Sequence, residues 1–359
     1  MSVLGAADRP GWMGRVLLVL VPVLLALVIT AGILLLVGAK PQTTLLKLLQ
    51  GSFGTGVKRA DVAVVWVSLV ICTAGLLVSF TAGQWNIGME GQIVLGAICA
   101  TWVGRQFVDI SGVLESGAPV GVMLAMFVGG IVGGVLWAMA AGALKVLGKV
   151  HEIFAGLGLN FVASAVSIYL IFGTWKQKSG GTLSGTVLLD EQLWLPTFQG
   201  FRASPYSLLI AVAVVAAVFF ALRGTLWGLQ LKAVGRNLRS ARTLGVSTHR
   251  VLFSAYAVCG ACAGLAGAVL VVGVHHRLIP GISSGHGFLG ILIALLSGFQ
   301  ALYIAPIALF FAALSIGSIA LQLDLKLDSS LAGVAQGVMV LCVLLVQGVR
   351  EWRSGGRSA

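Results

Sequence analysis

The chain has 359 residues, of which 58% are hydrophobic and only 9% are charged, and its net charge at pH 7 is +12. A soluble fold carries about 25% charged residues, so this composition excludes a water-soluble protein. The Lys and Arg residues lie between apolar runs, whereas nucleic-acid binding needs them clustered on one accessible face. The sequence therefore predicts an integral membrane protein with no nucleic acid as a partner.

Eight apolar runs are long enough to cross a bilayer, since a helix needs about 20 residues to span roughly 30 Å of hydrocarbon. They predict transmembrane helices at residues 16–37, 62–80, 120–144, 153–172, 206–222, 251–273, 302–323 and 331–349. The first run is too long for the apolar part of a signal peptide, and we expect it to be retained. Two weaker runs, at 91–108 and 287–299, are shorter or interrupted by Gly and polar residues, which is typical of broken helices inside a bundle.

These ten runs predict an all-α fold, a polytopic transmembrane bundle of about ten helices. The whole chain, residues 1–359, is predicted to form a single transmembrane domain, with the helix bundle at 16–349 between short cytoplasmic tails at 1–15 and 350–359. Several glycines recur at the small-xxx-small spacing that lets helices pack closely. They are Gly129, Gly130, Gly133, Gly134, Gly260 and Gly264.

The orientation follows from the basic residues, because loops rich in Lys and Arg stay on the cytoplasmic side. The stretch 223–250 is the most basic connection, and placing it inside puts both termini in the cytoplasm when the number of helices is even. Of the 23 Lys and Arg residues, 13 are then inside. The other two long connections, 40–61 and 173–205, fall outside, and neither is long enough for a separate enzymatic domain.

No segment fits a nucleotide-binding or catalytic motif. The nearest approach to a P-loop, at 142–150, has five residues between its glycines and Val150 where Ser or Thr must hold magnesium. A formal G-x-G-x-x-G at 285–290 opens an apolar run, so helix packing explains it better than a dinucleotide site does. We expect no catalytic residue, no metal and no cofactor in this chain.

The most polar membrane segment is T-A-G-Q-W-N-I-G-M-E-G-Q at 81–92, between two apolar runs. A carboxylate at the membrane centre costs about 2.5 to 3.5 kcal/mol on insertion scales, so Glu90 must face protein or water and find a partner. Two interpretations stay open. Glu90 either hydrogen-bonds freed backbone at a broken helix or lines a path for a substrate.

A second polar cluster, K-V-H-E-I-F-A-G-L-G-L-N at 149–160, marks the start of a predicted helix. His151 and Glu152 have no further metal-ligating neighbours in sequence, which argues against a metal or acid–base site. Glu152 instead suits the positive end of the helix that begins there. Asn160, one to two turns further on, is the better candidate for a pore.

The third cluster is the basic stretch 231–250, within which a short basic helix is predicted between Gly235 and Gly245. Asn237 is placed to cap this helix and Gly245 to end it. The stretch either contacts anionic lipid as a basic inner loop or docks onto a cytoplasmic partner.

These segments, taken in order, carry the motifs N-I-G-M-E-G-Q, H-E-I-F-A-G-L-G-L-N, G-R-N-L-R-S-A-R-T-L-G-V and G-H-G-F-L-G-I-L-I-A-L-L-S-G. Together they resemble the permease subunits of bacterial nucleoside and simple-sugar importers of the ATP-binding-cassette (ABC) class, in the branch that includes ribose-type permeases. The resemblance covers residues 62–359. It implies a second, similar permease, two cytoplasmic ATPase subunits that hold ATP and magnesium, an extracellular binding protein that is often a lipoprotein, and a bacterial cytoplasmic membrane.

The resemblance also implies roles for individual residues. The residues that match the coupling helix, which would dock onto the ATPase, are Gly235, Arg236, Asn237, Arg239, Ala241, Arg242 and Gly245. A nucleoside path needs amides, a carboxylate and an aromatic ring, and the candidates are Trp85, Asn86, Glu90, Gln92 and Asn160. A ribose-type sugar remains the alternative substrate. A stand-alone ion-coupled transporter is less favoured, because it would concentrate ionisable residues at mid-membrane.

Overall fold

The computed structural model describes residues 41–108, 113–114, 118–176, 185–197 and 202–325, together with isolated positions near the two ends of the chain. The chain divides into two compact units, which are described separately. One unit comprises residues 1–62 and 310–359, and the other comprises residues 63–309. Apart from isolated positions, the helices predicted at 16–37 and 331–349 lie outside the described residues.

The described residues form helices joined by turns, with a single isolated bridge between Val108 and Leu114. The prediction of an all-α fold is therefore confirmed. The helices are α2 (Pro41–Phe53), α3 (Gly56–Thr81), α4 (Met89–Arg105), α5 (Pro119–Val146), α6 (Glu152–Phe172), α7 (Pro205–Gly224), α8 (Leu226–Arg236), α9 (Leu238–Thr243), α10 (Thr248–Leu270), α11 (His286–Leu296) and α12 (Ile304–Leu325). Three short turns of other helix types are Glu191–Leu193, Val271–His275 and Ala301–Tyr303.

Six helical segments in the described part of the chain are long and apolar enough to cross a membrane. They confirm six of the eight longer predicted spans. The segments are Gly56–Thr81, Pro119–Val146, Glu152–Phe172, Pro205–Gly224, Thr248–His275 and Ala301–Ile319. The two weaker runs are helices as well, namely α4 and the short α11.

The predicted connection at 40–61 contains helix α2 and the first turns of α3. The sequence P-Q-T-T-L-L-K-L-L-Q of α2 mixes polar and apolar residues, so a search for apolar runs passes over it. Within its own unit, α2 packs against the later half of α12. Ser52 Oγ donates hydrogen bonds to the carbonyl oxygens of Leu48, at 2.8 Å, and Ala313, at 2.6 Å.

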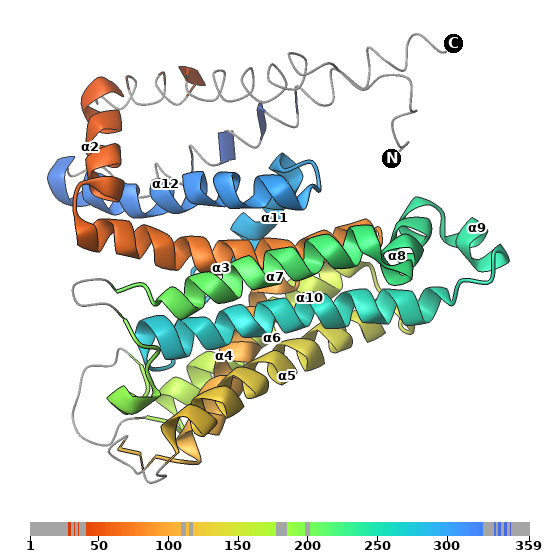
Figure 1. Ribbon diagram of the computed structural model, residues 1–359, viewed down its shortest axis with the longest axis horizontal. Helices are drawn as coiled ribbons and strands as arrows, with labels where there is room; N and C mark the ends of the chain where they lie inside the picture. Colours follow the sequence, from red (N-terminus) through yellow and green to blue (C-terminus); the bar gives the residue numbers. More distant parts are fainter. Residues whose placement is uncertain are drawn as a thin grey trace. The chain divides into compact units, whose positions relative to one another are not determined.

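In the unit of residues 63–309, α5 packs against α4, α6 and α10, and α8 and α9 lie together at one end (Figure 1). Helix α10 is central, since 72% of its apolar window is buried, against 28% for α6 and 22% for α7. The outer faces of α6 and α7 expose large apolar side chains, including Phe161, Tyr169 and Phe220. Such faces are stable only against lipid or another apolar surface.

Glycines bring α4, α5 and α10 into backbone contact, as their spacing predicts. A methyl group on Gly264 of α10 would overlap the carbonyl oxygen of Gly130 on α5 and lie 3.0 Å from the Cα of Gly134. A methyl group on Gly96 of α4 would lie 2.7 Å from the Gly264 carbonyl oxygen. Only small residues allow helices to approach this closely, and the crossing fixes α4 against the centre of the unit.

The segment 185–195 lies along the end of α10 and the turn that follows it. Backbone hydrogen bonds join Thr186 to Leu278 at 2.9 Å and Leu189 to His276 at 2.9 Å. The Trp194 indole stacks on the His276 ring with 3.9 Å between centroids. Asp190 adds a link to the loop after α4, because its Oδ2 accepts a hydrogen bond from the Leu114 amide at 2.9 Å.

We expect this Asp190 link to weaken in acid. Hydrogen bonds from the amides of Gln192 and Leu114 lower the pKa of the Asp190 carboxyl below its usual 3.8. A lowered folded-state pKa stabilises the fold fully above the unfolded-state value of 3.8, and the stabilisation is lost as the pH falls from there through the folded-state pKa. Between about pH 6 and pH 3 the protection of the Leu114 amide against hydrogen exchange should fall several-fold.

The matched control for this prediction is Asp190→Asn, which keeps an oxygen acceptor and cannot titrate. Its Leu114 protection should be lower than that of the wild type at neutral pH and should not change over the same range. Equal pH dependence in the two proteins, after correction for intrinsic exchange rates, would contradict the prediction.

Candidate functional site

The polar segment at 81–92 is a break between two helices, α3 ending at Thr81 and α4 beginning at Met89. Gly83 turns the chain with φ of +72°, a conformation that glycine adopts without strain. The Ser79 hydroxyl donates to the Gln84 carbonyl oxygen at 3.0 Å, and the Gln84 amide donates back to the Ser79 carbonyl oxygen at 3.0 Å. We call residues 82–88 the break loop.

Asn86 and Gln92 pair their side-chain amides across the break. Gln92 Nε2 donates to Asn86 Oδ1 at 3.0 Å, and Asn86 Nδ2 donates to Gln92 Oε1 at 3.2 Å. Asn86 Nδ2 also donates to Cys259 Sγ of α10 at 3.0 Å. Both amide side chains are buried, so these bonds offset the cost of placing two amides in an apolar interior.

Asn160 of α6 ties the break loop to α4. Its Oδ1 accepts from the Gly91 amide at 2.8 Å, and its Nδ2 donates to the Ile87 carbonyl oxygen at 2.9 Å. The first amides of a helix have no partner within the helix, and Asn160 supplies one for α4. The backbones are also close here, since a methyl group on Gly156 would lie 2.6 Å from the Gly88 nitrogen.

Glu90, in the first turn of α4, caps the start of α11. Its Oε1 accepts from the Gly285 amide at 2.9 Å and its Oε2 from the Gly287 amide at 2.7 Å. A carboxylate at a helix N-terminus satisfies free amides and complements the positive end of the helix dipole. The structural interpretation of Glu90 is therefore confirmed, and its role in a pathway stays a prediction.

Trp85 is the most exposed of the five predicted pathway residues, at 38% of its surface, whereas Glu90 is partly exposed and Asn86, Gln92 and Asn160 are buried. The ring centroids of Trp85 and Phe80 are 5.3 Å apart, and those of Phe80 and Phe299 are 5.5 Å apart. Sequence reasoning missed both phenylalanines. Phe80 adjoins the polar motif and could have been found, whereas nothing in the sequence connects Phe299 to position 85.

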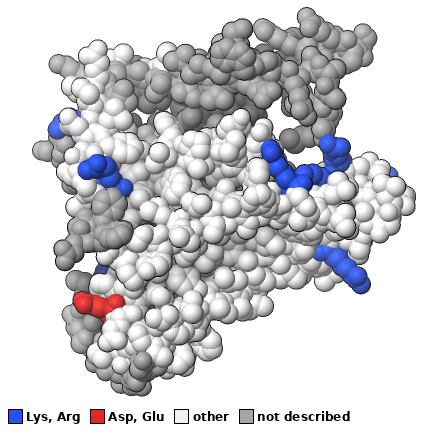
Figure 2. All heavy atoms as spheres, in the orientation of Figure 1, with Lys and Arg blue, Asp and Glu red and all other residues white. Residues whose placement is uncertain are grey.

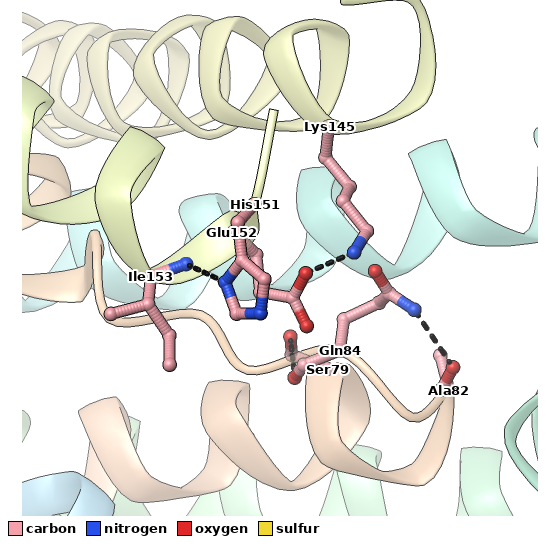
Figure 3. A network of polar contacts seen from close by, with 7 residues as sticks. All are labelled: Ser79, Ala82, Gln84, Lys145, His151, Glu152 and Ile153. Carbon is pink, nitrogen blue, oxygen red and sulfur yellow. Dashed lines mark hydrogen bonds and ion pairs between the residues drawn. The ribbon is translucent and has the colours of Figure 1, made fainter. Parts of the chain in front are cut away.

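The turn between α5 and α6 lies close to the break loop (Figure 3). Lys145 and Glu152 form an ion pair across this turn, and His151 caps α6 by accepting the Ile153 amide at Nδ1, at 3.4 Å. Gln84 is buried in the loop, and its Oε1 has no partner among the described residues. Within the described part of the chain, no three His, Cys, Asp or Glu side chains are grouped so that they could hold a metal ion.

The basic stretch folds as predicted into a short capped helix, α9. Asn237 Oδ1 accepts from the amides of Arg239 and Ser240 at 3.0 and 3.1 Å, and Gly245 follows the helix with φ of +80°. Arg236, Arg239 and Arg242 are exposed and Ala241 is buried. In the unit of residues 63–309, Lys and Arg side chains lie at the end that carries α8 and α9 (Figure 2). The helix itself is confirmed, and its docking role stays a prediction.

Comparison with known proteins places these features in one family. The model of the family described as "Branched-chain amino acid transport system / permease component" matches residues 59–344. The glucose ABC transporter permease protein TsgB13 of Haloferax volcanii is 30% identical over 82% of this chain and 78% of its own length. The guanosine ABC transporter permease protein NupP of Bacillus subtilis is 27% identical over 94% of this chain and 95% of its own length. The guanosine ABC transporter permease protein NupQ of the same organism is 22% identical over 68% of this chain and 76% of its own length.

Proposed function

We propose that this chain, which belongs to the family of branched-chain amino acid transport system permease components and is a multi-pass ABC transporter permease subunit, carries a nucleoside. Membership of this family rules out the stand-alone ion-coupled transporter considered from the sequence. As a permease it is a transport subunit and has no enzymatic activity of its own.

The exposed Trp85 indole at the polar break carries the proposal of a nucleoside. A nucleobase stacks on an aromatic face, and Phe80 and Phe299 extend the aromatic surface beside Trp85. Ribose hydroxyls need acceptors, and the partly exposed Glu90 carboxylate has lone pairs left after its two backbone bonds. Similarity to a guanosine permease over nearly the whole of both chains supports the same substrate class.

In this proposal the other three predicted pathway residues shape the path without binding the substrate. The side-chain amides of Asn86 and Gln92 hydrogen-bond to each other, and that of Asn86 also donates to Cys259. The amide of Asn160 hydrogen-bonds to the backbone of Gly91 and Ile87. The three side chains hold the break loop in place between α3 and α4, so that Trp85 and Glu90 keep their positions. Irregular backbone at membrane depth is stable only where it is buried in protein or lines a cavity.

The proposed partners are a second, related permease, a pair of ATPase subunits and an extracellular binding protein. Similarity of this chain to both NupP and NupQ, two permeases named for guanosine transport in one organism, favours a pair of unlike permeases. ATP binding on the ATPase pair would rock the permeases between inward-facing and outward-facing states, and hydrolysis would reset them. Helix α9 would dock on the ATPase from the cytoplasm.

A simple sugar is the second candidate substrate, because a relative at 30% identity is a glucose permease. A sugar also binds to carboxylates and stacks on aromatic rings, so Trp85 and Glu90 suit it in part. The nucleoside is preferred because a base needs the larger aromatic surface that Phe80 and Phe299 supply.

The test is uptake by the complete transporter, reconstituted in vesicles with its partner permease, ATPase and binding protein. Labelled guanosine, ribose and glucose are compared with ATP and with a non-hydrolysable analogue inside the vesicles. We expect ATP-dependent guanosine uptake. Trp85→Ala should reduce it about tenfold, since stacking on one aromatic ring is worth about 1–3 kcal/mol per base, and Trp85→Phe should retain most of it.

Uptake of a sugar alone would replace the nucleoside with the second candidate. Guanosine uptake that is the same in Trp85→Ala and Trp85→Phe would remove Trp85 from the path. Uptake with the analogue equal to uptake with ATP would contradict transport coupled to hydrolysis.

A further inference from the structure

The basic stretch and the break loop approach each other closely through their backbones. Gly235 lies at the end of α8, and a methyl group on it would overlap the Thr81 carbonyl oxygen and lie 3.1 Å from the Gly83 nitrogen. In the other direction, a methyl group on Gly83 would lie 3.2 Å from the Gly235 Cα. No side chain separates the two segments, so a shift of one must be followed by the other.

The far side of the break loop is also held. Gly156 of α6 approaches the Gly88 nitrogen, Asn160 holds the Ile87 carbonyl oxygen, and Asn86 is bonded to Cys259 of α10. A displacement that enters at Gly83 therefore reaches Trp85 and Asn86 within two or three residues. The loop is therefore held from α6 and α10 as well as from α8.

The two ends of α9 are joined to their neighbours very differently. Towards α8 the single residue Asn237 intervenes, and its backbone amide donates to the Ala233 carbonyl oxygen at 3.1 Å while its side chain caps α9. Towards α10 four residues intervene, 244–247, and they include Gly245 at φ of +80°. The shorter connection leads to Gly235. The longer one, across which Arg242 donates a hydrogen bond to Thr248 Oγ1 at 3.4 Å, leads to α10.

We propose that the contact of Gly235 with Thr81 and Gly83 is the point through which movement of α9 reaches the substrate path. Gly235 is then a positioning residue inside the permease, in contrast to the docking role that the sequence resemblance implies for it. The ATPase moves α9, Asn237 passes the movement to α8, and Gly235 passes it to the break loop. This inference rests on the proposed function, which assigns α9 to the ATPase and the break loop to the path.

The first test is Gly235→Ala in the complete transporter, with uptake and ATP hydrolysis measured in the same vesicles. The added methyl group meets backbone, so α8 and the break loop are forced apart. Substrate carried per ATP should fall about tenfold, while hydrolysis per transporter stays within about twofold of the wild type. The matched control is Gly158→Ala on α6, where an added methyl group has no atom within 4 Å. If Gly235→Ala carries as much substrate per ATP hydrolysed as Gly158→Ala does, the inference is overturned.

A second pair of variants decides the matter if Gly235→Ala does not fold. Two glycines inserted between Arg236 and Asn237 leave Gly235 in place and loosen its link to α9. The same insertion between Val246 and Ser247 loosens the link from α9 to α10 instead. We expect the first insertion to reduce substrate carried per ATP about tenfold and the second to reduce it much less. Equal losses, or a larger loss for the second insertion, would overturn the inference.

The wild-type transporter separates this inference from the proposed substrate. If it carries glucose in place of guanosine, the nucleoside proposal fails, and the ratios are measured with glucose. If it carries guanosine and the variants keep the wild-type ratio, the inference fails and the nucleoside proposal stands.

Discussion

Gly264→Ala is expected to lower the free energy of unfolding of the permease by about 3 kcal/mol, the upper part of the usual range for overpacking. The new methyl group would overlap the Gly130 carbonyl oxygen and crowd the Gly134 Cα. Both obstacles are backbone atoms, so no side chain can rotate away, and α5 and α10 must separate along their length. Unfolding of the detergent-solubilised protein, followed by helix content against denaturant concentration, measures the loss.

Gly158→Ala is the control for this experiment as well. It adds the same methyl group to a helix that also lies in the unit of residues 63–309, in open space. Because alanine is favoured over glycine within a helix by about 1 kcal/mol, this variant should be as stable as the wild type or slightly more stable. If the free energy of unfolding of Gly264→Ala is no lower than that of Gly158→Ala, the crossing of α5 and α10 tolerates a larger residue.

Glu90→Ala is expected to have the second large effect, about 3 kcal/mol of local stability at the start of α11. The carboxylate accepts hydrogen bonds from the Gly285 and Gly287 amides, and bonds to a charged group contribute about 1.5–3 kcal/mol each. Without it, the amides of Gly285, which is half-buried, and Gly287, which is buried, lose their acceptors. Hydrogen exchange at residues 285–290 should accelerate about a hundredfold or more, with the centre of α10 unchanged.

Glu90→Gln separates the hydrogen bonds from simple loss of the side chain. Glutamine retains one oxygen acceptor, but its NH₂ group faces an amide donor, so one of the two bonds is lost. Exchange at residues 285–290 should lie between that of the wild type and that of Glu90→Ala. If Glu90→Ala and the wild type exchange at the same rate, the carboxylate does not hold α11.

The membrane spans could be predicted from the sequence because a bilayer imposes a length. About 20 consecutive apolar residues have few alternatives to a crossing helix, and the described segments at 119–146 and 205–224 match their predicted runs within a few residues. Helix α9 could be predicted for a different reason. Its cap, Asn237, and its terminating glycine, Gly245, act on backbone within a few residues of themselves.

The partners of the polar residues could not be predicted in the same way. Glu90 binds amides about 195 residues further along the chain, and Asn160 binds one 69 residues earlier. The sequence shows that a buried carboxylate needs a partner, but several amides and cations satisfy that requirement equally well. The contact of Gly235 with Thr81 is still less visible, because glycine contributes no side chain whose chemistry would indicate a neighbour.

The long separation of Glu90 from Gly285 has a consequence for biosynthesis. A ribosome adds about 5–20 residues per second, so the 195 positions between them take roughly 10–40 seconds to synthesise. During that time α4 has a carboxylate without its final partner, while the six helices α5 to α10 follow it out of the ribosome. The nascent chain must keep this segment in contact with water, with the insertion machinery or with a temporary partner until α11 arrives.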